Sequence, residues 1–134
     1  MTHDEATVDT DLRHTVLVVE DDRAIREMIE FWLREHDIRV ITAQDGAEAI
    51  AILATQPDAL CCVLLDIMLP RRSGLDVLRD LRARGRTTPV IAMSADRQSL
   101  ADAIHAGAAV VVAKPFDVHD LMSIVVRHCS GQHP

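Results

Sequence analysis

The chain has 134 residues and a formal net charge of −7. This length can bury one substantial core but leaves no room for a second domain of similar size, so we expect a single domain. The acidic balance removes the electrostatic attraction that nucleic acid offers a basic protein, and direct nucleic-acid binding is not expected. No apolar run reaches the roughly 20 residues of a membrane helix, and residues 1–13 do not look like a secretory signal. These features predict a cytoplasmic protein without membrane contact.

Short apolar runs alternate five times with longer helical patterns along the chain. The expected strands are Val16–Val19, Ile38–Thr42, Leu60–Leu65, Val90–Met93 and Ala109–Ala113. Most of these runs are apolar at consecutive positions, which is typical of parallel strands that helices cover on both faces. The sequence therefore predicts an α/β domain over residues 14–130 with a doubly wound, five-stranded parallel sheet. A flexible acidic tail at 1–13 and a short tail at 131–134 would flank it.

Polar residues mark where four of the expected helices begin. Asp22, Asp45, Ser73 and Asp117 each stand where a side-chain oxygen can cap a helix N-terminus. The apolar residues that recur at helical spacing after them are interpreted as core faces and not as part of a cofactor site.

The cysteines and histidines lack the spacing of a metal site or a redox motif. Cys61 and Cys62 are adjacent within an apolar run, and Cys129 lies far away near the end of the chain. We interpret all three as reduced, mostly buried thiols. The seven histidines are scattered, so no metal site built from histidine or cysteine is predicted.

Carboxylates follow two of the expected strands. Glu20, Asp21 and Asp22 come after the first strand, and Asp66 comes after the third. If these strands are neighbours, the acids converge at one edge of the sheet and repel one another, which favours a bound cation. Oxygen ligands of this kind suit Mg²⁺. Asp22 is interpreted as a helix cap only, and Glu20 and Asp21 could also be solvated loop acids.

Two more strand ends add a hydroxyl and an ammonium group. Ser94 follows the fourth strand and Lys114 follows the fifth. Taken singly, Ser94 could cap a helix and Lys114 could form an ordinary salt bridge. Taken together with the acids, they suit a phosphoryl group, because a metal and a lysine neutralise its oxygens while a hydroxyl donates a hydrogen bond.

Four segments, in order, resemble the motifs of response-regulator receiver domains of two-component signalling systems. They are Val18–Asp22, Asp66–Pro70 with Gly74, Met93–Ala95 and Lys114–Phe116. The resemblance covers Thr15 to Cys129 and implies the flavodoxin-like strand order 2-1-3-4-5. It also implies a stand-alone phosphoacceptor module of a phosphorelay. Such a module is no enzyme in the usual sense and has only Mg²⁺-dependent self-phosphorylation and self-dephosphorylation chemistry.

The resemblance assigns four residues to the metal and the phosphoacceptor. Asp66 would be the phosphoacceptor and a Mg²⁺ ligand, and Asp21 would be the second carboxylate ligand. Met68 would contribute its backbone carbonyl, and Glu20 would act through water. A histidine kinase or a histidine phosphotransfer protein would be the donor.

The remaining motif residues would bind the phosphoryl group or support the switch. Ser94 would bond to the phosphoryl group, and Lys114 would pair first with Asp66 and then with a phosphoryl oxygen. Ala95 and Gly74 belong to the same motifs, and the peptide bond before Pro115 would be cis.

One position departs from the family pattern. Val111 stands three residues before Lys114, where receivers usually place an aromatic ring that moves on activation. We hypothesise that the last strand and its flanking helices, with His105, Val111 and Leu121 nearby, still form a surface for a downstream protein or for self-association. A well-buried edge strand is the competing interpretation.

Arg71 and Arg72 form a basic pair in the loop after Asp66. They could contact an acidic surface of the kinase or phosphodonor, but simple solvation is the favoured interpretation.

Three alternative functions remain open at this point. A degenerate receiver would bind partners without being phosphorylated. A phosphotransfer or phosphatase enzyme would use an aspartate nucleophile after the first strand, and Glu20 and Asp22 have the required interval, but no segment is long enough to form a substrate-covering cap. A flavin-binding protein is disfavoured because the first β/α turn lacks a phosphate-binding cradle.

Overall fold

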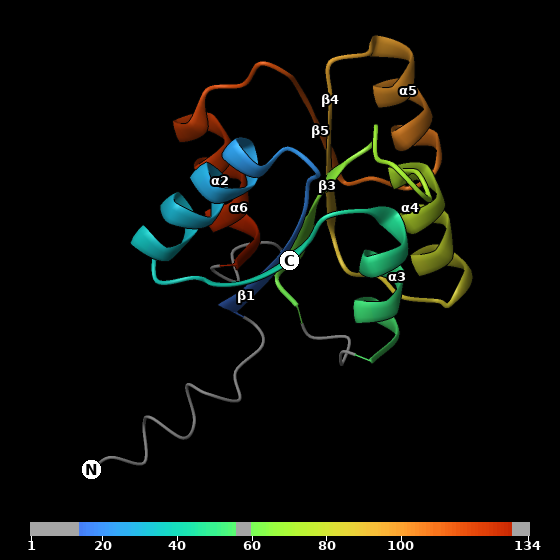
Figure 1. Cartoon of the computed structure of the whole chain (residues 1–134), viewed down its shortest axis with the longest axis horizontal. Helices are drawn as coiled ribbons and strands as arrows, with labels where there is room; N and C mark the ends of the chain where they lie inside the picture. Colours follow the sequence, from blue (N-terminus) through green and yellow to red (C-terminus); the bar gives the residue numbers. More distant parts are fainter. Residues whose placement is uncertain (1–13, 56–59, 130–134) are drawn as a thin grey trace.

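The computed structural model describes residues 14–55 and 60–129, and the predicted tails at 1–13 and 131–134 lie outside them. Within these ranges strands and helices alternate along the chain (Figure 1). In order, the elements are β1 (Thr15–Val19), α2 (Arg23–Glu35), β2 (Arg39–Ala43), α3 (Gly46–Thr55), β3 (Cys62–Asp66), α4 (Gly74–Ala83), β4 (Val90–Ser94), α5 (Arg97–His105), β5 (Val110–Ala113) and α6 (Val118–Cys129).

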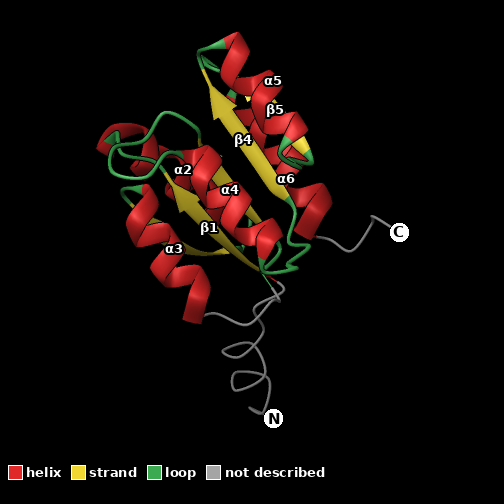
Figure 2. Ribbon diagram, turned by 90° about the vertical axis from the view of Figure 1, so that its right-hand side faces the viewer, coloured by secondary structure: helices red, strands yellow, loops and turns green. Residues whose placement is uncertain are grey.

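The strands form one parallel sheet in the order β2-β1-β3-β4-β5, which confirms the predicted fold. Figure 2 shows β1 and β4 running in the same direction through the sheet. In the register of the sheet, Val19 pairs with Leu65 of β3, and Asp66 pairs with Met93 of β4. The residues that follow β1, β3 and β4 are therefore neighbours at the carboxyl edge of the sheet.

Helices cover both faces of the sheet, with α2 and α6 on one side and α3, α4 and α5 on the other (Figure 1). Alternate residues of β1 point to opposite cores: Leu17 and Val19 face α3, α4 and α5, whereas Val16 and Val18 face α2 and α6. Because both faces are buried, the central strands can be apolar at every position. None of the described helices combines the length and apolarity needed to cross a bilayer.

The edge strand β5 is less buried than its sequence suggested. Its three valines are only half-buried, and Ala113 is exposed. The interpretation as a well-buried edge strand is therefore wrong. Leu121 of α6 is fully buried in the core between this helix and the sheet, so it cannot contribute to a surface beside β5.

Side-chain caps begin the helices as predicted. The acceptors Asp22, Asp45, Ser73 and Asp117 bind the amides of Ile25, Glu48, Asp76 and His119 at 3.0, 2.8, 3.2 and 2.7 Å, respectively. Each cap satisfies an amide that has no partner within its own helix. These contacts also fix where the chain turns after β1, β2, β3 and β5 at the carboxyl edge.

The cysteines do not all remain reduced. Cys61, directly before β3, and Cys129, the last residue of α6, form a disulfide with their Cα atoms 4.9 Å apart. The interpretation as reduced thiols is therefore wrong for this pair. No local pattern in the sequence indicated the bond, because 68 residues separate the two cysteines and only the fold brings them together. Cys62 is free, and burial raises the pKa of its thiol to about 12.

Candidate functional site

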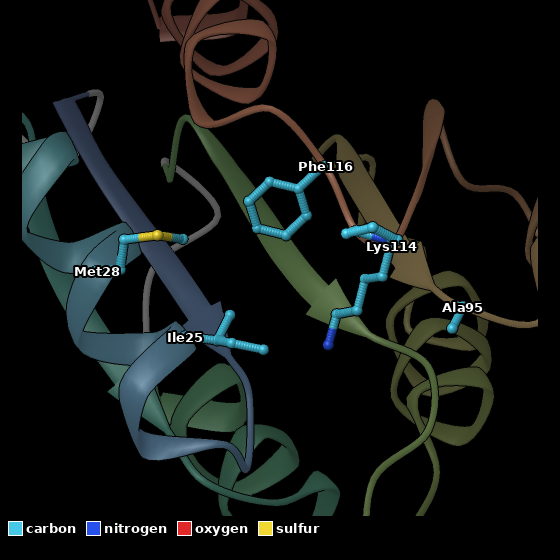
Figure 3. Close-up of a pocket in the computed structure, with 6 residues that line it drawn as sticks. Ile25, Met28, Ala95, Lys114 and Phe116 are labelled. Atoms are coloured by element: carbon cyan, nitrogen blue, oxygen red, sulfur yellow. The ribbon is translucent and has the colours of Figure 1, made fainter.

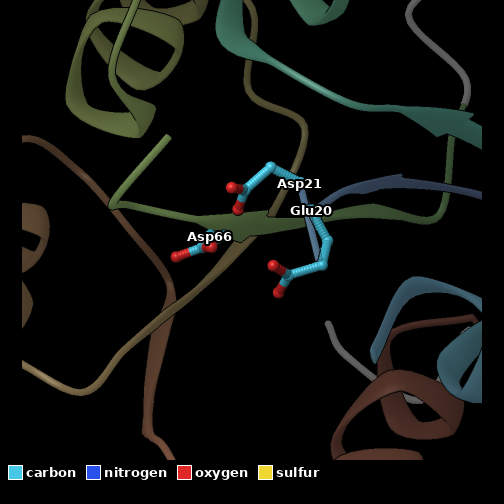
Figure 4. Close-up of side chains that lie close together, drawn as sticks. All are labelled: Glu20, Asp21 and Asp66. Carbon is cyan, nitrogen blue, oxygen red and sulfur yellow. The ribbon is translucent and has the colours of Figure 1, made fainter. Parts of the chain in front are cut away.

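Three carboxylates converge at the carboxyl edge of the sheet (Figure 4). Single oxygens of Glu20, Asp21 and Asp66 all lie within 4.8 Å of one another. Glu20 and Asp66 are only 1% and 4% exposed, whereas Asp21 is exposed. Like charges at this separation raise the free energy of the folded state unless a cation neutralises them. An all-oxygen donor set that is open on one side can bind a hard divalent ion.

Lys114 joins two of these acids, and the nearer one is not the acid that the resemblance implied. Its Nζ donates to Glu20 Oε1 at 2.7 Å and to Asp66 Oδ2 at 3.3 Å. The pairing with Asp66 is present, but sequence reasoning missed the contact with Glu20. The only available signal was that Glu20 directly follows a fully buried strand.

Burial and charge oppose each other in this group. Desolvation raises the pKa of the Glu20 carboxyl to about 7, although the hydrogen bond from Lys114 lowers it. Desolvation also lowers the pKa of Lys114, but the hydrogen bonds and charges of Glu20 and Asp66 outweigh this effect and leave it above its usual value. Lys114 therefore stays cationic, whereas Glu20 can exchange its proton near neutral pH.

The loop after β3 is held closely against Asp66. The amide of Met68 donates to Asp66 Oδ1 at 3.1 Å, and the Met68 side chain is largely exposed. Gly74 begins α4 so close to the strand that a Cβ there would lie 2.4 Å from the carbonyl oxygen of Asp66. A larger residue at this position would push α4 away from the end of β3.

Ser94 is the last residue of β4, the strand that pairs with β3. It is buried at the end of β4, and its carbonyl accepts a hydrogen bond from the amide of Lys114 at 2.9 Å. Its Oγ accepts from the amide of Asp96, and Asp96, not Ser94, caps α5. The interpretation of Ser94 as a helix cap is therefore wrong. Ala95 follows it and is exposed.

An open pocket of about 380 Å³ lies beside Lys114 (Figure 3). Its lining residues are Ile25 and Met28 of α2 together with Ala95, Lys114, Pro115 and Phe116. The Lys114–Pro115 peptide bond is cis, as the resemblance implied. A molecule that approaches the acids from this side would pass mainly apolar side chains.

The basic pair after Asp66 is not simply solvated. Arg71 forms an ion pair with Asp45 at the start of α3. Arg72 lies 3.7 Å from a carboxylate oxygen of Asp76 in α4. Both side chains are still largely exposed, at 72% and 56%, as the favoured interpretation of the pair as solvated expects, and the ion pair of Arg71 is an additional contact.

The 2-1-3-4-5 sheet and the acidic cluster at its carboxyl edge define a receiver-type α/β fold. A family model described as "Response regulator receiver domain" matches residues 16–126. The chain belongs to this family, whose members are signalling modules of two-component systems.

Similar proteins come from curated sequences and from solved structures. Response regulator MprA of Mycobacterium sp. strain KMS is 40% identical over 112 residues, which cover 81% of this chain and 47% of the relative. The MprA of Mycobacterium ulcerans is 39% identical over the same coverage. The chain thus spans about half the length of the curated relatives it matches.

Two solved receiver domains illustrate the structural similarity. The receiver domain of Francisella response regulator 1452 has a TM-score of 0.80 at 28% identity and covers 88% of this chain and 98% of that one. The receiver domain of the sensor histidine kinase PA1611 of Pseudomonas aeruginosa has a TM-score of 0.78 at 30% identity, with coverages of 87% and 98%. The latter structure holds a magnesium ion coordinated in its active-site cleft.

Proposed function

We propose that this receiver domain accepts a phosphoryl group on Asp66 from a phosphohistidine donor, with the help of Mg²⁺. The observation that carries the proposal is the position of the Asp66 carboxylate. It is buried at the end of β3, lies within reach of two further carboxylates, and has the Lys114 ammonium 3.3 Å from its Oδ2 atom. A candidate cation site and the positive charge of Lys114 thus flank one carboxylate, and this combination supports a role in phosphoryl transfer.

The donor set fits a hard divalent cation because every group in it is an oxygen atom. Asp21 and Asp66 would bind Mg²⁺ directly, Met68 would add its backbone carbonyl, and Glu20 would act through water. When bound, Mg²⁺ neutralises the repulsion among the carboxylates and the charge on the phosphoryl oxygens.

The residues of the chain would then carry out the transfer. A carboxylate oxygen of Asp66 attacks phosphorus, an O–P bond forms, and the N–P bond of the donor breaks with its electron pair returning to the imidazole. Lys114 Nζ and Ser94 Oγ would donate hydrogen bonds to the transferred oxygens. Hydrolysis of the acyl phosphate by water would return Asp66 to its carboxylate form.

Transfer would change the surface near β5. The phosphoryl group adds about −1.5 to −2 charge next to Lys114, which directly follows that strand. Half-buried Val111 and exposed Ile104 and His105 lie on β5 and the adjoining α5. We propose the last strand and its flanking helices as the surface for a downstream protein or for self-association, with a switch that does not depend on an aromatic ring at Val111.

A histidine kinase or a histidine phosphotransfer protein is the proposed donor, in accord with the response regulators and the kinase receiver to which the chain is similar. We further propose that residues 14–130 form the complete receiver unit. On this view it acts in the cytoplasm, without direct contact with nucleic acid or membrane.

Intact mass tests the proposed function directly. The chain is incubated with a small-molecule phosphodonor and Mg²⁺, and then with a phosphorylated histidine donor, beside Asp66→Asn and a metal-free control. We expect one added phosphoryl group on the unmodified chain and none in either control. No gain even from the histidine donor would instead favour a receiver that binds partners without phosphorylation. Steady turnover of free phosphoesters would favour the alternative function as a phosphotransfer or phosphatase enzyme.

A further inference from the structure

The loop that joins β3 to α4 is held at its base and at its tip. At its base, the amide of Gly74 donates to the carbonyl of Ile67 at 2.9 Å. At its tip, the Arg71 guanidinium pairs with Asp45 at the start of α3. Met68 lies between these two points. Its amide is held by Asp66 Oδ1, and the contacts at the base and the tip hold the chain on either side of it.

The backbone at the tip adopts a conformation that non-glycine residues rarely use. Arg71 and Arg72 have φ angles of +52° and +87°. Such a conformation persists only where the surroundings hold it. The first residue of α3 provides one such contact, because a Cβ on Gly46 would lie 1.8 Å from the carbonyl oxygen of Arg72. The tip therefore packs directly on the N-terminus of α3.

Asp45 has a separate task for each of its carboxylate oxygens. Its Oδ1 accepts from the amide of Glu48 at 2.8 Å and caps α3, whereas its Oδ2 pairs with Arg71. Its side chain is only 8% exposed. The amide of Glu48 and then the guanidinium of Arg71 lower the pKa of this carboxyl, so it stays charged at neutral pH. One rigid helix start thus holds a charge that can orient the loop.

We propose that the Arg71–Asp45 ion pair, which we name the loop anchor, positions the loop so that the Met68 carbonyl can bind Mg²⁺. This inference rests on the proposed function. Arg71 would be a positioning residue, since it acts through the loop and not on the metal or the phosphoryl group. Its side chain is 72% exposed. Because exposed ion pairs contribute modestly, we expect loss of the anchor to weaken Mg²⁺ binding by about two- to fivefold.

The sign of the effect separates the loop anchor from simple electrostatics. Removing a positive charge near a cation site would strengthen Mg²⁺ binding by Coulomb's law. The loop anchor predicts the opposite for Arg71→Gln, namely weaker binding. Arg72→Gln is a matched control, because Arg72 is on the same loop, has the same charge and shares the left-handed backbone, but pairs with Asp76.

The experiment titrates Mg²⁺ alone into the chain and follows the amide resonances of residues 20, 21 and 66 by NMR, with thermal melting to confirm folding. We expect weaker binding for Arg71→Gln and a near-normal affinity for Arg71→Lys, which keeps the charge. Asp45→Asn keeps a capping oxygen and should weaken binding. The double variant Arg71→Gln/Asp45→Asn should bind Mg²⁺ no more weakly than Asp45→Asn alone, because both substitutions remove the same ion pair.

Unchanged or tighter binding by Arg71→Gln, or an equal loss in Arg72→Gln, would overturn the loop anchor while leaving the proposed function intact. Absence of Mg²⁺ binding by the unmodified chain would overturn both. A chain that is phosphorylated on Asp66 and binds Mg²⁺, with the loss confined to the Arg71 and Asp45 variants, would establish the loop anchor.

Discussion

The two ends of the parallel sheet differ in chemistry although the same strands form both. At the carboxyl end, Glu20, Asp66 and Lys114 are charged groups held at or near the core. At the amino end of β3, the covalent Cys61–Cys129 link ties the strand to α6. Buried like charges lower stability unless they are neutralised, whereas a cross-link over a long loop raises it. The comparison separates the end that holds the proposed reaction site from the end that carries the covalent link.

Removal of the disulfide should give the largest change in stability. Cys129→Ser opens a link that spans 68 residues, and we expect the free energy of unfolding to fall by about 2–4 kcal/mol. Urea denaturation measures this loss, and reduction of the unmodified chain should reproduce it. Phosphoryl acceptance at 25 °C should be unchanged, because the link lies at the opposite end of β3 from Asp66. A marked drop in acceptance by the folded variant would contradict the separation of the two ends.

Replacement of Lys114 should affect both reaction and stability. Lys114→Met leaves Glu20 and Asp66 without their shared cation, and we expect a loss of about 1–2 kcal/mol in the free energy of unfolding at pH 8. The rate of phosphoryl acceptance should fall about a hundredfold, since a donor to the transferred oxygens is gone. Intact mass of samples quenched at successive times measures the rate of phosphoryl acceptance.

Asp37→Asn is a control for general effects of charge, because Asp37 is exposed in the turn between α2 and β2, away from the carboxyl edge. It should leave acceptance unchanged. If Lys114→Met accepted the phosphoryl group at the normal rate, Lys114 would have no role in the transfer.

The smallest expected effect is a pH dependence at the carboxyl end. Burial raises the pKa of Glu20 from 4.5 to about 7, so the folded chain binds more protons than the unfolded chain between these values. The stabilising effect of that proton is complete below about pH 4.5 and is lost as the pH rises towards about 7. Urea denaturation of the metal-free chain should therefore show a stability that declines across this window.

Glu20→Gln should flatten that decline, because the amide does not titrate. Cys129→Ser should show the same decline with pH, but with a lower free energy of unfolding at every pH. An unchanged slope in Glu20→Gln would show that another group controls the pH dependence.

Local patterns in the sequence were sufficient for the elements and for part of the site. The caps Asp22 and Ser73 bind amides three residues along the chain, so their contacts follow from neighbours in the sequence. Apolar runs without alternation indicated strands buried on both faces. Because parallel strands end at the same edge, the order of the motifs already placed the acids, Ser94 and Lys114 together. The individual roles of the site residues stay predictions.

The sequence by itself therefore determined the five β/α units, the parallel sheet and the edge at which the charged residues meet. Only the tertiary structure decided which groups pair there. Lys114 and Glu20 are 94 residues apart, Arg71 and Asp45 are 26 apart, and the two bonded cysteines are 68 apart. No local spacing signals such contacts, because they depend on strand order and on how closely each loop packs against a neighbouring helix. For the same reason the half-exposed state of β5 was decided by its place at the sheet edge, and not by its run of valines.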